Sequence, residues 1–237
     1  MAPGDTATSA VLWDVDGTLL SAKGSGARCF RDALLEVAGH PWPAGPHDFG
    51  GRTDVDIGSM ILLAAAPDGP VDPEVLTRLL TTVERMYEAR EAEFADTTVA
   101  LPGVHDAVDA LDAAGVLQTV VTGNMASIAR RKLRAVGLVE RLRLDLGAYG
   151  DDHADRAALM AAAVERLAVA TSPPAPLERT WIIGDTPRDL AAARAVGARC
   201  ALVATGTFPI DVLAELDADV VPPDLTAADD LILQIAG

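Results

Sequence analysis

The sequence predicts an α/β protein, with a parallel sheet core and an inserted all-helical domain. Short apolar segments of strand length alternate with segments in which apolar residues recur at helical spacing, a pattern typical of parallel α/β sheets. Half of the 237 residues are apolar, which excludes a disordered chain. One long stretch, residues 21–97, interrupts the alternation, because it contains helical patterns and no convincing strand.

The expected strands are apolar runs bounded by turn residues. Four are clear and a fifth is weaker: Ala10–Asp14, Leu117–Thr122, Trp181–Asp185 and Arg199–Thr205, with Ala218–Val221. Helical patterns accompany these strands and three of them end in glycine, as helix C-termini often do. Two helices of the core are expected at Met125–Val136 and Ala157–Leu167.

The stretch that lacks strands divides into helices separated by turn-rich segments. The clearest helices are Ala27–Ala38, Thr53–Ala65 and Pro73–Phe94. The break Leu101-Pro102-Gly103 marks the return to the sheet. The sequence therefore predicts a core formed by residues 1–20 and 98–237 and a helical domain formed by residues 21–97.

Composition limits the partners and the compartment. The net charge of −16 opposes binding to nucleic acid or to an anionic membrane. No apolar run approaches the ~20 residues of a membrane helix, and Met1–Ala10 has neither the basic nor the apolar residues of a signal peptide. The two cysteines, Cys29 and Cys200, lie far apart in the sequence, which favours a reducing cytoplasm. The expected state is a monomer or homodimer.

Polar residues follow three of the expected strands. The three loops are Asp14-Val15-Asp16-Gly17-Thr18, Thr122-Gly123-Asn124 and Gly184-Asp185-Thr186-Pro187-Arg188-Asp189. Because the carboxyl ends of parallel strands meet at one edge of the sheet, where ligands bind in open α/β sheets, the three loops are expected to converge. Charges clustered at that edge are costly, and they therefore indicate chemistry.

Phosphoryl transfer through an aspartyl-phosphate needs these residue types. Asp14 is ionised at neutral pH, at a reference pKa of about 3.9, and can attack phosphorus without a base to activate it. A divalent cation, Mg²⁺, held by Asp14 and Asp185 would relieve the repulsion between carboxylate and phosphate. Asp16 would protonate the leaving oxygen and later deprotonate the attacking water. Gly17 permits a tight turn, and Thr122 offers a hydroxyl and a backbone N–H to the phosphate.

The chain resembles the haloacid dehalogenase superfamily in its phosphatase branch, over nearly its whole length. The resemblance implies a Rossmann-like core with a helical cap after the first strand, with Asp14 as nucleophile and Asp16 as acid and base. It also implies Mg²⁺ on Asp14, Asp185 and the backbone carbonyl of Asp16, with Asp189 supporting the metal. Thr18, Gly123, Asn124 and Arg52 are expected to bind the phosphate or the substrate.

The third motif of the family departs from its usual form here, because the family usually supplies a lysine. Arg156 stands in the matching place, before the expected helix Ala157–Leu167, and its planar fork can hold a carboxylate and a phosphate. The alternative cation, Lys132, belongs to a basic cluster with Arg130, Arg131 and Arg134, which is expected to face solvent.

Several residues keep a second interpretation. Thr186 to Asp189 form a good helix start in their own right, so that Asp189 is a cap residue or a support for the metal. Asn124 caps the following helix or contacts the substrate, and Arg52 selects the substrate or lies in a solvated loop.

The expected function is Mg²⁺-dependent hydrolysis of a small soluble phosphorylated metabolite, such as phosphoglycolate or a sugar phosphate. A sugar phosphomutase and a non-catalytic phosphate-binding protein are the alternatives. Haloacid dehalogenation needs neither the metal nor an acid at Asp16, so Asp16 argues against it.

Overall fold

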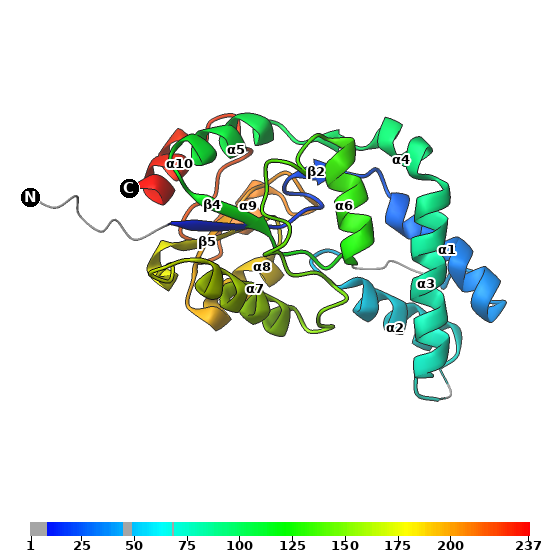
Figure 1. The fold of residues 1–237 in the computed structure, drawn as a ribbon. Helices are drawn as coiled ribbons and strands as arrows, with labels where there is room; N and C mark the ends of the chain where they lie inside the picture. Colours follow the sequence, from blue (N-terminus) through cyan, green and yellow to red (C-terminus); the bar gives the residue numbers. More distant parts are fainter. Residues whose placement is uncertain (1–8, 45–48, 68) are drawn as a thin grey trace, which may run out of the picture.

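The computed structural model describes residues 9–44, 49–67 and 69–237, and in them four parallel strands form a sheet in the order β4-β1-β5-β6 (Figure 1). The strands are β1 (Ala10–Trp13), β4 (Leu117–Val120), β5 (Thr180–Gly184) and β6 (Arg199–Leu202). They confirm the four clear predictions, and each ends before its expected range does, because the chain leaves the sheet there to form a loop. The start of the expected core segment 1–20 lies outside the described residues.

The fifth expected strand, Ala218–Val221, is wrong as a strand. Val220 makes an isolated bridge with Ala201, and the Leu202 N–H donates to the Val220 carbonyl at 3.0 Å. The segment therefore runs beside β6 for too short a distance to extend the sheet.

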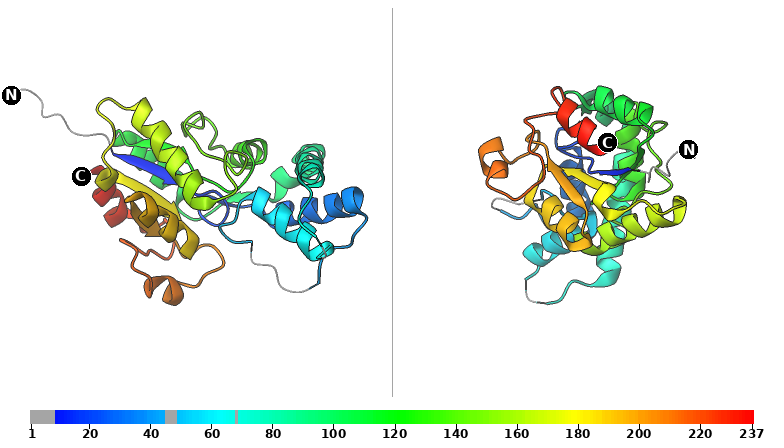
Figure 2. Two further views of the ribbon diagram at one scale, coloured as in Figure 1. Left: turned by 90° about the horizontal axis from the view of Figure 1, so that it is seen from below. Right: turned by 90° about the vertical axis from the view of Figure 1, so that its left-hand side faces the viewer.

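Helices cover both faces of the sheet (Figures 1 and 2). Because side chains alternate along a strand, Val11 and Trp13 of β1 point to one face and Ala10 and Leu12 to the other. The first face carries α5 (Val104–Ala113), α6 (Ala126–Ala135) and α10 (Asp229–Ala236). The second carries α7 (Arg156–Ala170), α8 (Pro187–Val196) and α9 (Ile210–Ala214), and a short 3₁₀ turn, Leu177–Arg179, precedes β5.

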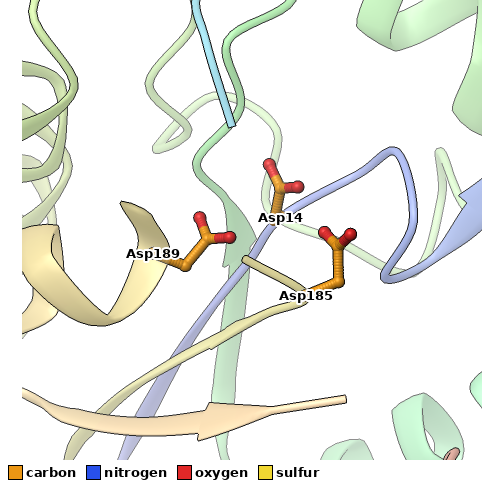
Figure 3. Close-up of side chains that lie close together, drawn as sticks. All are labelled: Asp14, Asp185 and Asp189. Atoms are coloured by element: carbon orange, nitrogen blue, oxygen red, sulfur yellow. The ribbon is translucent and has the colours of Figure 1, made fainter. Parts of the chain in front are cut away.

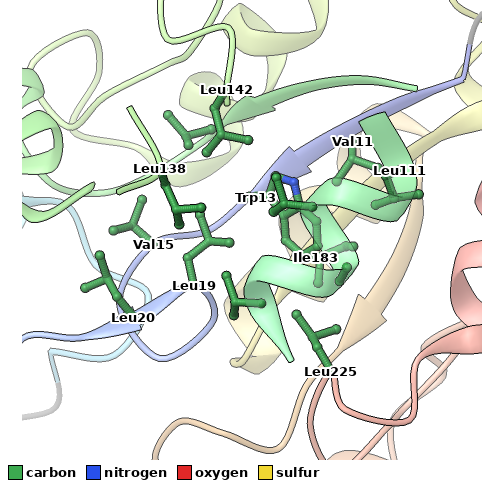
Figure 4. Packing of buried hydrophobic residues seen from close by; sticks show 14 of the residues in the cluster. Val11, Trp13, Val15, Leu19, Leu20, Leu111, Leu138, Leu142, Ile183 and Leu225 are labelled. Atoms are coloured by element: carbon green, nitrogen blue, oxygen red, sulfur yellow. The ribbon is translucent and has the colours of Figure 1, made fainter. Parts of the chain in front are cut away.

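Figure 4 shows the core on the first face, where Leu111 of α5 lies beside Val11 and Trp13 lies close to Ile183. Trp13 is fully buried and its indole N–H donates to the Gln118 side chain at 3.1 Å. Each large apolar side chain buried in this way contributes roughly 1.5–3 kcal/mol. This core therefore fixes the direction of β1, and with it the place where Asp14 leaves the sheet.

Between the short strands β2 (Leu20–Ser21) and β3 (Val99–Ala100), the described residues 22–44, 49–67 and 69–98 contain four helices. They are α1 (Ser25–Ala38), α2 (Asp54–Ala65), α3 (Pro73–Ala89) and α4 (Glu91–Thr97). They form a core of their own, which also includes Ile128 of α6 and Met125 at the N-cap of that helix. The left view of Figure 2 shows this group beyond one end of the sheet.

Two features of this helical segment differ from expectation. The strands β2 and β3 pair antiparallel, and two residues each are too few to give an alternating pattern in the sequence. The single helix expected over Pro73–Phe94 is interrupted at Arg90, where φ is −111°. The interruption brings the Tyr87 and Phe94 rings to 4.7 Å between centroids, closer than seven residues along one continuous helix would allow.

Within the described part of the chain, no helix is both long and apolar enough to cross a membrane.

Candidate active site

The three loops converge on one cavity of about 380 Å³ at the carboxyl ends of the strands, facing α1 and the start of α2. Members of all three expected loops line it, and the set also includes cations from neighbouring elements. These lining residues are Asp14, Asp16, Gly17, Thr122, Gly123, Asn124, Asp185, Arg52, Lys132 and Arg156. Thr18 lies behind this surface, where its hydroxyl is 3.4 Å from Asp185 Oδ1.

Three buried carboxylates lie at the centre of the site (Figure 3). Asp14 follows β1, Asp185 follows β5, and Asp189 lies in the first turn of α8. One oxygen of each lies within 4.8 Å of the others. Strands β1 and β5 are hydrogen-bonded neighbours whose register pairs Trp13 with Ile183, so Asp14 leaves the sheet level with Gly184, the residue before Asp185.

Burial gives these carboxylates an unusual electrostatic state. It raises the pKa of Asp14 to about 7, an effect that Arg156 partly offsets and the charge of Asp189 reinforces. Burial, followed by the charges of Asp14 and Asp189, raises the pKa of Asp185 to about 8. The negative charges of the cluster therefore exceed what Arg156 can balance, and a further cation among them would lower both pKa values.

Arg156 is the guanidinium that contacts this cluster. It donates to Asp14 Oδ1 at 3.0 Å and forms an ion pair with Asp189, and its side chain is 10% exposed. It is the first residue of α7, whose N-cap Asp155 accepts a hydrogen bond from the Ala158 N–H. The structure thus brings Arg156 to the place that the sequence predicted for it.

Two glycines leave the space that Asp185 occupies. A Cβ added at Gly206 would lie 1.6 Å from Asp185 Oδ2, and one added at Gly17 would lie 2.4 Å from it. Gly17 also has φ +86°, which other residues rarely adopt. Sequence reasoning identified Gly17 but missed Gly206, because the contact joins segments far apart in the chain.

The donor set fits a hard divalent cation. Carboxylate oxygens are the ligands that Mg²⁺ prefers, and here they are buried, close together and short of positive charge. Asp14 and Asp185 are the best placed of the three, because both line the cavity.

Asp189 has the structural role that the helix-start interpretation expects. It forms a capping box with Thr186, whose hydroxyl and backbone N–H donate to Asp189 Oδ2 at 2.6 and 3.1 Å. Its other oxygen faces Arg156. Asp189 therefore both starts α8 and holds Arg156, and it does so within reach of Asp14 and Asp185.

Lys132 is the main correction to the sequence-based expectations. It was expected to face solvent, but its side chain is 5% exposed and its Nζ donates to Asp16 Oδ2 at 2.5 Å and to Asn124 Oδ1 at 2.6 Å. A signal was present in the sequence, because Lys132 falls at helical spacing on the same stripe as Ile128 and Leu133, which are buried. The face of α6 that carries these residues turns inward.

The other members of the basic cluster pair outside the site. Arg131 forms ion pairs with Glu88 and Glu91, and Arg134 forms one with Glu91. Arg130 donates to the Leu144 carbonyl at 3.1 Å. The solvated interpretation was therefore wrong for Lys132 alone.

Asn124 lines the cavity and does not cap the following helix. Helix α6 has Met125 at its N-cap position and no side-chain cap hydrogen bond. The Asn124 side chain instead accepts from Lys132, and its backbone N–H is 3.2 Å from the Thr122 hydroxyl. The cap interpretation of Asn124 was wrong.

The start of α2 packs directly on the second loop. The Asp54 N–H donates to the Gly123 carbonyl at 2.7 Å, and Asp54 Oδ2 accepts from the Met125 N–H at 2.8 Å. A Cβ at Gly123 would lie 2.0 Å from the Arg52 carbonyl oxygen. Arg52 itself lines the cavity and pairs with Asp56 at 2.6 Å. Sequence reasoning missed Asp54, whose buried carboxylate follows an ordinary helix-capping threonine.

Comparison with known proteins agrees with this geometry. Residues 8–197 match the model of the haloacid dehalogenase-like hydrolase family. A phosphoglycolate phosphatase from Nitrosospira multiformis is 30% identical over 227 residues, which cover 94% of this chain and 95% of the relative.

Solved structures share the fold. A hydrolase from Pseudomonas syringae has a TM-score of 0.70 at 22% identity, covering 97% of this chain and 100% of that one. CbbY from Rhodobacter sphaeroides, in complex with phosphate, has a TM-score of 0.72 at 20% identity, covering 94% and 96%. The family match, the relative and the fold agree: the chain belongs to the haloacid dehalogenase-like hydrolase family.

Proposed function

We propose that this protein is a Mg²⁺-dependent phosphomonoester hydrolase that acts on a small phosphorylated metabolite through an aspartyl-phosphate on Asp14. The family match and the phosphoglycolate phosphatase relative support a phosphatase. The observation that carries the proposal is the convergence of Asp14, Asp185 and Asp189 with Arg156 at one sheet edge, beside a cavity that also exposes Asp16.

Asp14 is the proposed nucleophile. Its free oxygen attacks phosphorus while the ester P–O bond breaks, and the leaving oxygen carries away the electron pair. Arg156 contacts the other oxygen, Oδ1, and so fixes the direction in which Asp14 attacks. Arg156 also places positive charge where the phosphoryl oxygens would lie, together with the hydroxyl and N–H groups of the loop Thr122-Gly123-Asn124.

Asp16 is the proposed acid and base. It gives a proton to the leaving oxygen as the phospho-enzyme forms, and it then takes a proton from the water that attacks that phospho-enzyme. The second step releases inorganic phosphate and regenerates Asp14. The Asp16 side chain is 40% exposed, so it is accessible from the cavity in which both steps would take place.

Asp14, Asp185 and the backbone carbonyl of Asp16 are the residues that would hold Mg²⁺, with Asp189 in support. Bound there, the metal would offset the repulsion between the carboxylates and an incoming phosphate. The positive charge of the metal would also lower the pKa values of Asp14 and Asp185, which burial raises.

We further propose that residues 21–97 form a cap domain over a core of residues 1–20 and 98–237, and that Thr18, Gly123, Asn124 and Arg52 help to bind the phosphate or the substrate. A cavity of about 380 Å³ suits a metabolite of few atoms, such as phosphoglycolate or a small sugar phosphate. The proposed compartment is the cytoplasm, supported by two buried cysteines that form no disulfide, and the proposed state is a monomer or homodimer.

The test is phosphate release from a panel of phosphomonoesters, measured with Mg²⁺ and again with excess EDTA. We expect turnover of phosphoglycolate or a sugar phosphate that EDTA abolishes. Asp14→Asn should reduce turnover by at least about 10³-fold with the fold retained by circular dichroism, because an amide is a poor nucleophile. Transfer of the phosphoryl group between sugar positions without phosphate release would instead indicate a phosphomutase. A folded protein that turns over no ester would exclude the hydrolase.

A further inference from the structure

We propose that Lys132 is a positioning residue that holds the Asp16 carboxylate in the orientation from which it exchanges a proton with the leaving oxygen. The inference rests on the function proposed above, because it assigns Lys132 to a step that Asp16 performs. It concerns a different cation from Arg156, which contacts Asp14 and Asp189.

The geometry places the two members of this pair at different depths. The Lys132 side chain is 5% exposed, whereas the Asp16 side chain is 40% exposed and both line the cavity. The ammonium therefore lies beneath the carboxylate and contacts Oδ2 at 2.5 Å. One carboxylate oxygen is held from below, and the side chain still faces the space that a substrate would occupy.

Lys132 can hold Asp16 because its own position is fixed. Ile128, Ala129 and Leu133 are buried on the same face of α6, so the helix cannot rotate to release the lysine. A second hydrogen bond, to Asn124 Oδ1 at 2.6 Å, fixes the ammonium from the side of the second loop. Asn124 is itself anchored, because its backbone carbonyl accepts a hydrogen bond from the Gly150 N–H at 2.8 Å.

The position of this cation also argues against a purely structural role. Taking an ammonium out of water costs several kcal/mol unless partners compensate. An apolar side chain would fill the same place on the stripe of α6 at no such cost. The Lys132 ammonium instead faces Asp16, the carboxylate that must be aimed at the leaving oxygen. Asp54 and Tyr87 add further negative or polar groups around the ammonium.

Two esters that differ in their need for an acid provide the test. The leaving oxygen of 4-nitrophenyl phosphate departs without a proton, whereas that of an alkyl phosphate from the active panel requires one. The quantity compared is kcat/KM, which reports steps up to formation of the phospho-enzyme. We expect Lys132→Met to reduce it by about 10²-fold for the alkyl ester and by much less for the aryl ester.

The same difference should appear in Asp16→Asn, and the double variant should be no worse than Asp16→Asn alone on the alkyl ester. Arg134→Met, on the same helix but with a side chain that is 62% exposed, is the matched control and should change neither ester. Lys132→Gln keeps a hydrogen-bond donor without the charge, and it serves if the methionine variant does not fold.

Each outcome decides between the two proposals. Equal losses on both esters, additive effects in the double variant, or the failure of both Lys132 variants to fold would show that Lys132 is structural. Each of these would overturn the present inference and leave the hydrolase intact. Wild-type protein that cleaves neither ester would overturn the proposed function, and the role of Lys132 with it.

Discussion

Individual residues in the active site divide into two sets, each with its own buried cation. Arg156 contacts Asp14 and Asp189, and Lys132 contacts Asp16 and Asn124. The nucleophile and the acid that we propose are therefore held by different elements, α7 and α6. A substitution of Arg156 should therefore disturb Asp14 and leave Asp16 in place, and a substitution of Lys132 should do the reverse.

Replacing Arg156 tests the first set. Arg156→Met leaves Asp14 and Asp189 buried without their partner, and we expect a loss of about 3–5 kcal/mol in the free energy of unfolding, with turnover abolished. Arg156→Lys retains the charge that the family usually supplies as lysine, and it should keep most of the stability and part of the turnover. Urea unfolding and phosphate release measure the two effects. Equal behaviour of the two variants would show that the charge of Arg156 is irrelevant.

The sequence predicted one of these two cations and not the other, for a physical reason. Arg156 could be found because it starts a helix at a fixed place in the order of motifs. Lys132 was assigned to solvent because a run of four basic residues in five positions is typical of a solvated face, and this pattern outweighed its helical spacing from Ile128. Only the packing of α6 against β1 and the helical segment decides which of them turns inward.

The strands that the sequence predicted correctly are those whose apolar pattern follows directly from their burial. The four sheet strands are apolar runs that are covered on both faces, so their pattern is visible in the sequence. Strands β2 and β3 and the interruption at Arg90 depend on partners distant in the chain, namely each other and the contact between Tyr87 and Phe94. The strand order β4-β1-β5-β6 likewise depends on contacts between segments that are distant in the chain.

The contact between α2 and the second loop gives a prediction for Gly123. Gly123→Ala should lower stability by about 1–3 kcal/mol and raise KM, because its Cβ would lie 2.0 Å from the Arg52 carbonyl and would push the start of α2 away. Gly26→Ala, in the first turn of α1, meets nothing within 4 Å and should leave stability unchanged or slightly higher. Thermal unfolding and steady-state kinetics measure both. A harmless Gly123→Ala would mean that this contact is not maintained in solution.

At the scale of the whole molecule, the free energy of unfolding depends on pH because a buried acidic side chain of the active site titrates differently in the folded and unfolded states. Burial raises the pKa of Asp185 from 3.8 to about 8. Because the folded pKa is the higher one, folding favours the protonated form, and the associated stability is lost as the pH rises from about 4 through about 8. Without metal, Asp185→Asn should therefore be more stable than wild type, by a margin that grows over this range. A margin independent of pH, measured by urea unfolding, would contradict the shift.

Magnesium should narrow that difference, because a bound cation adds to Arg156 in balancing the buried carboxylates of a chain whose net charge is −16. Saturating Mg²⁺, at about 100 times its Kd, should stabilise the wild type by about 2.7 kcal/mol, or roughly 5–10 °C in Tm for a domain of this size. NaCl of equal ionic strength controls for screening of the surface charge. Asp185→Asn should lose most of the Mg²⁺ response, whereas Asp145→Asn, at an exposed pair with Arg143, should keep it. An equal response in all three proteins would show that Mg²⁺ acts on the acidic surface as a whole, and not at the carboxylates that follow β1 and β5.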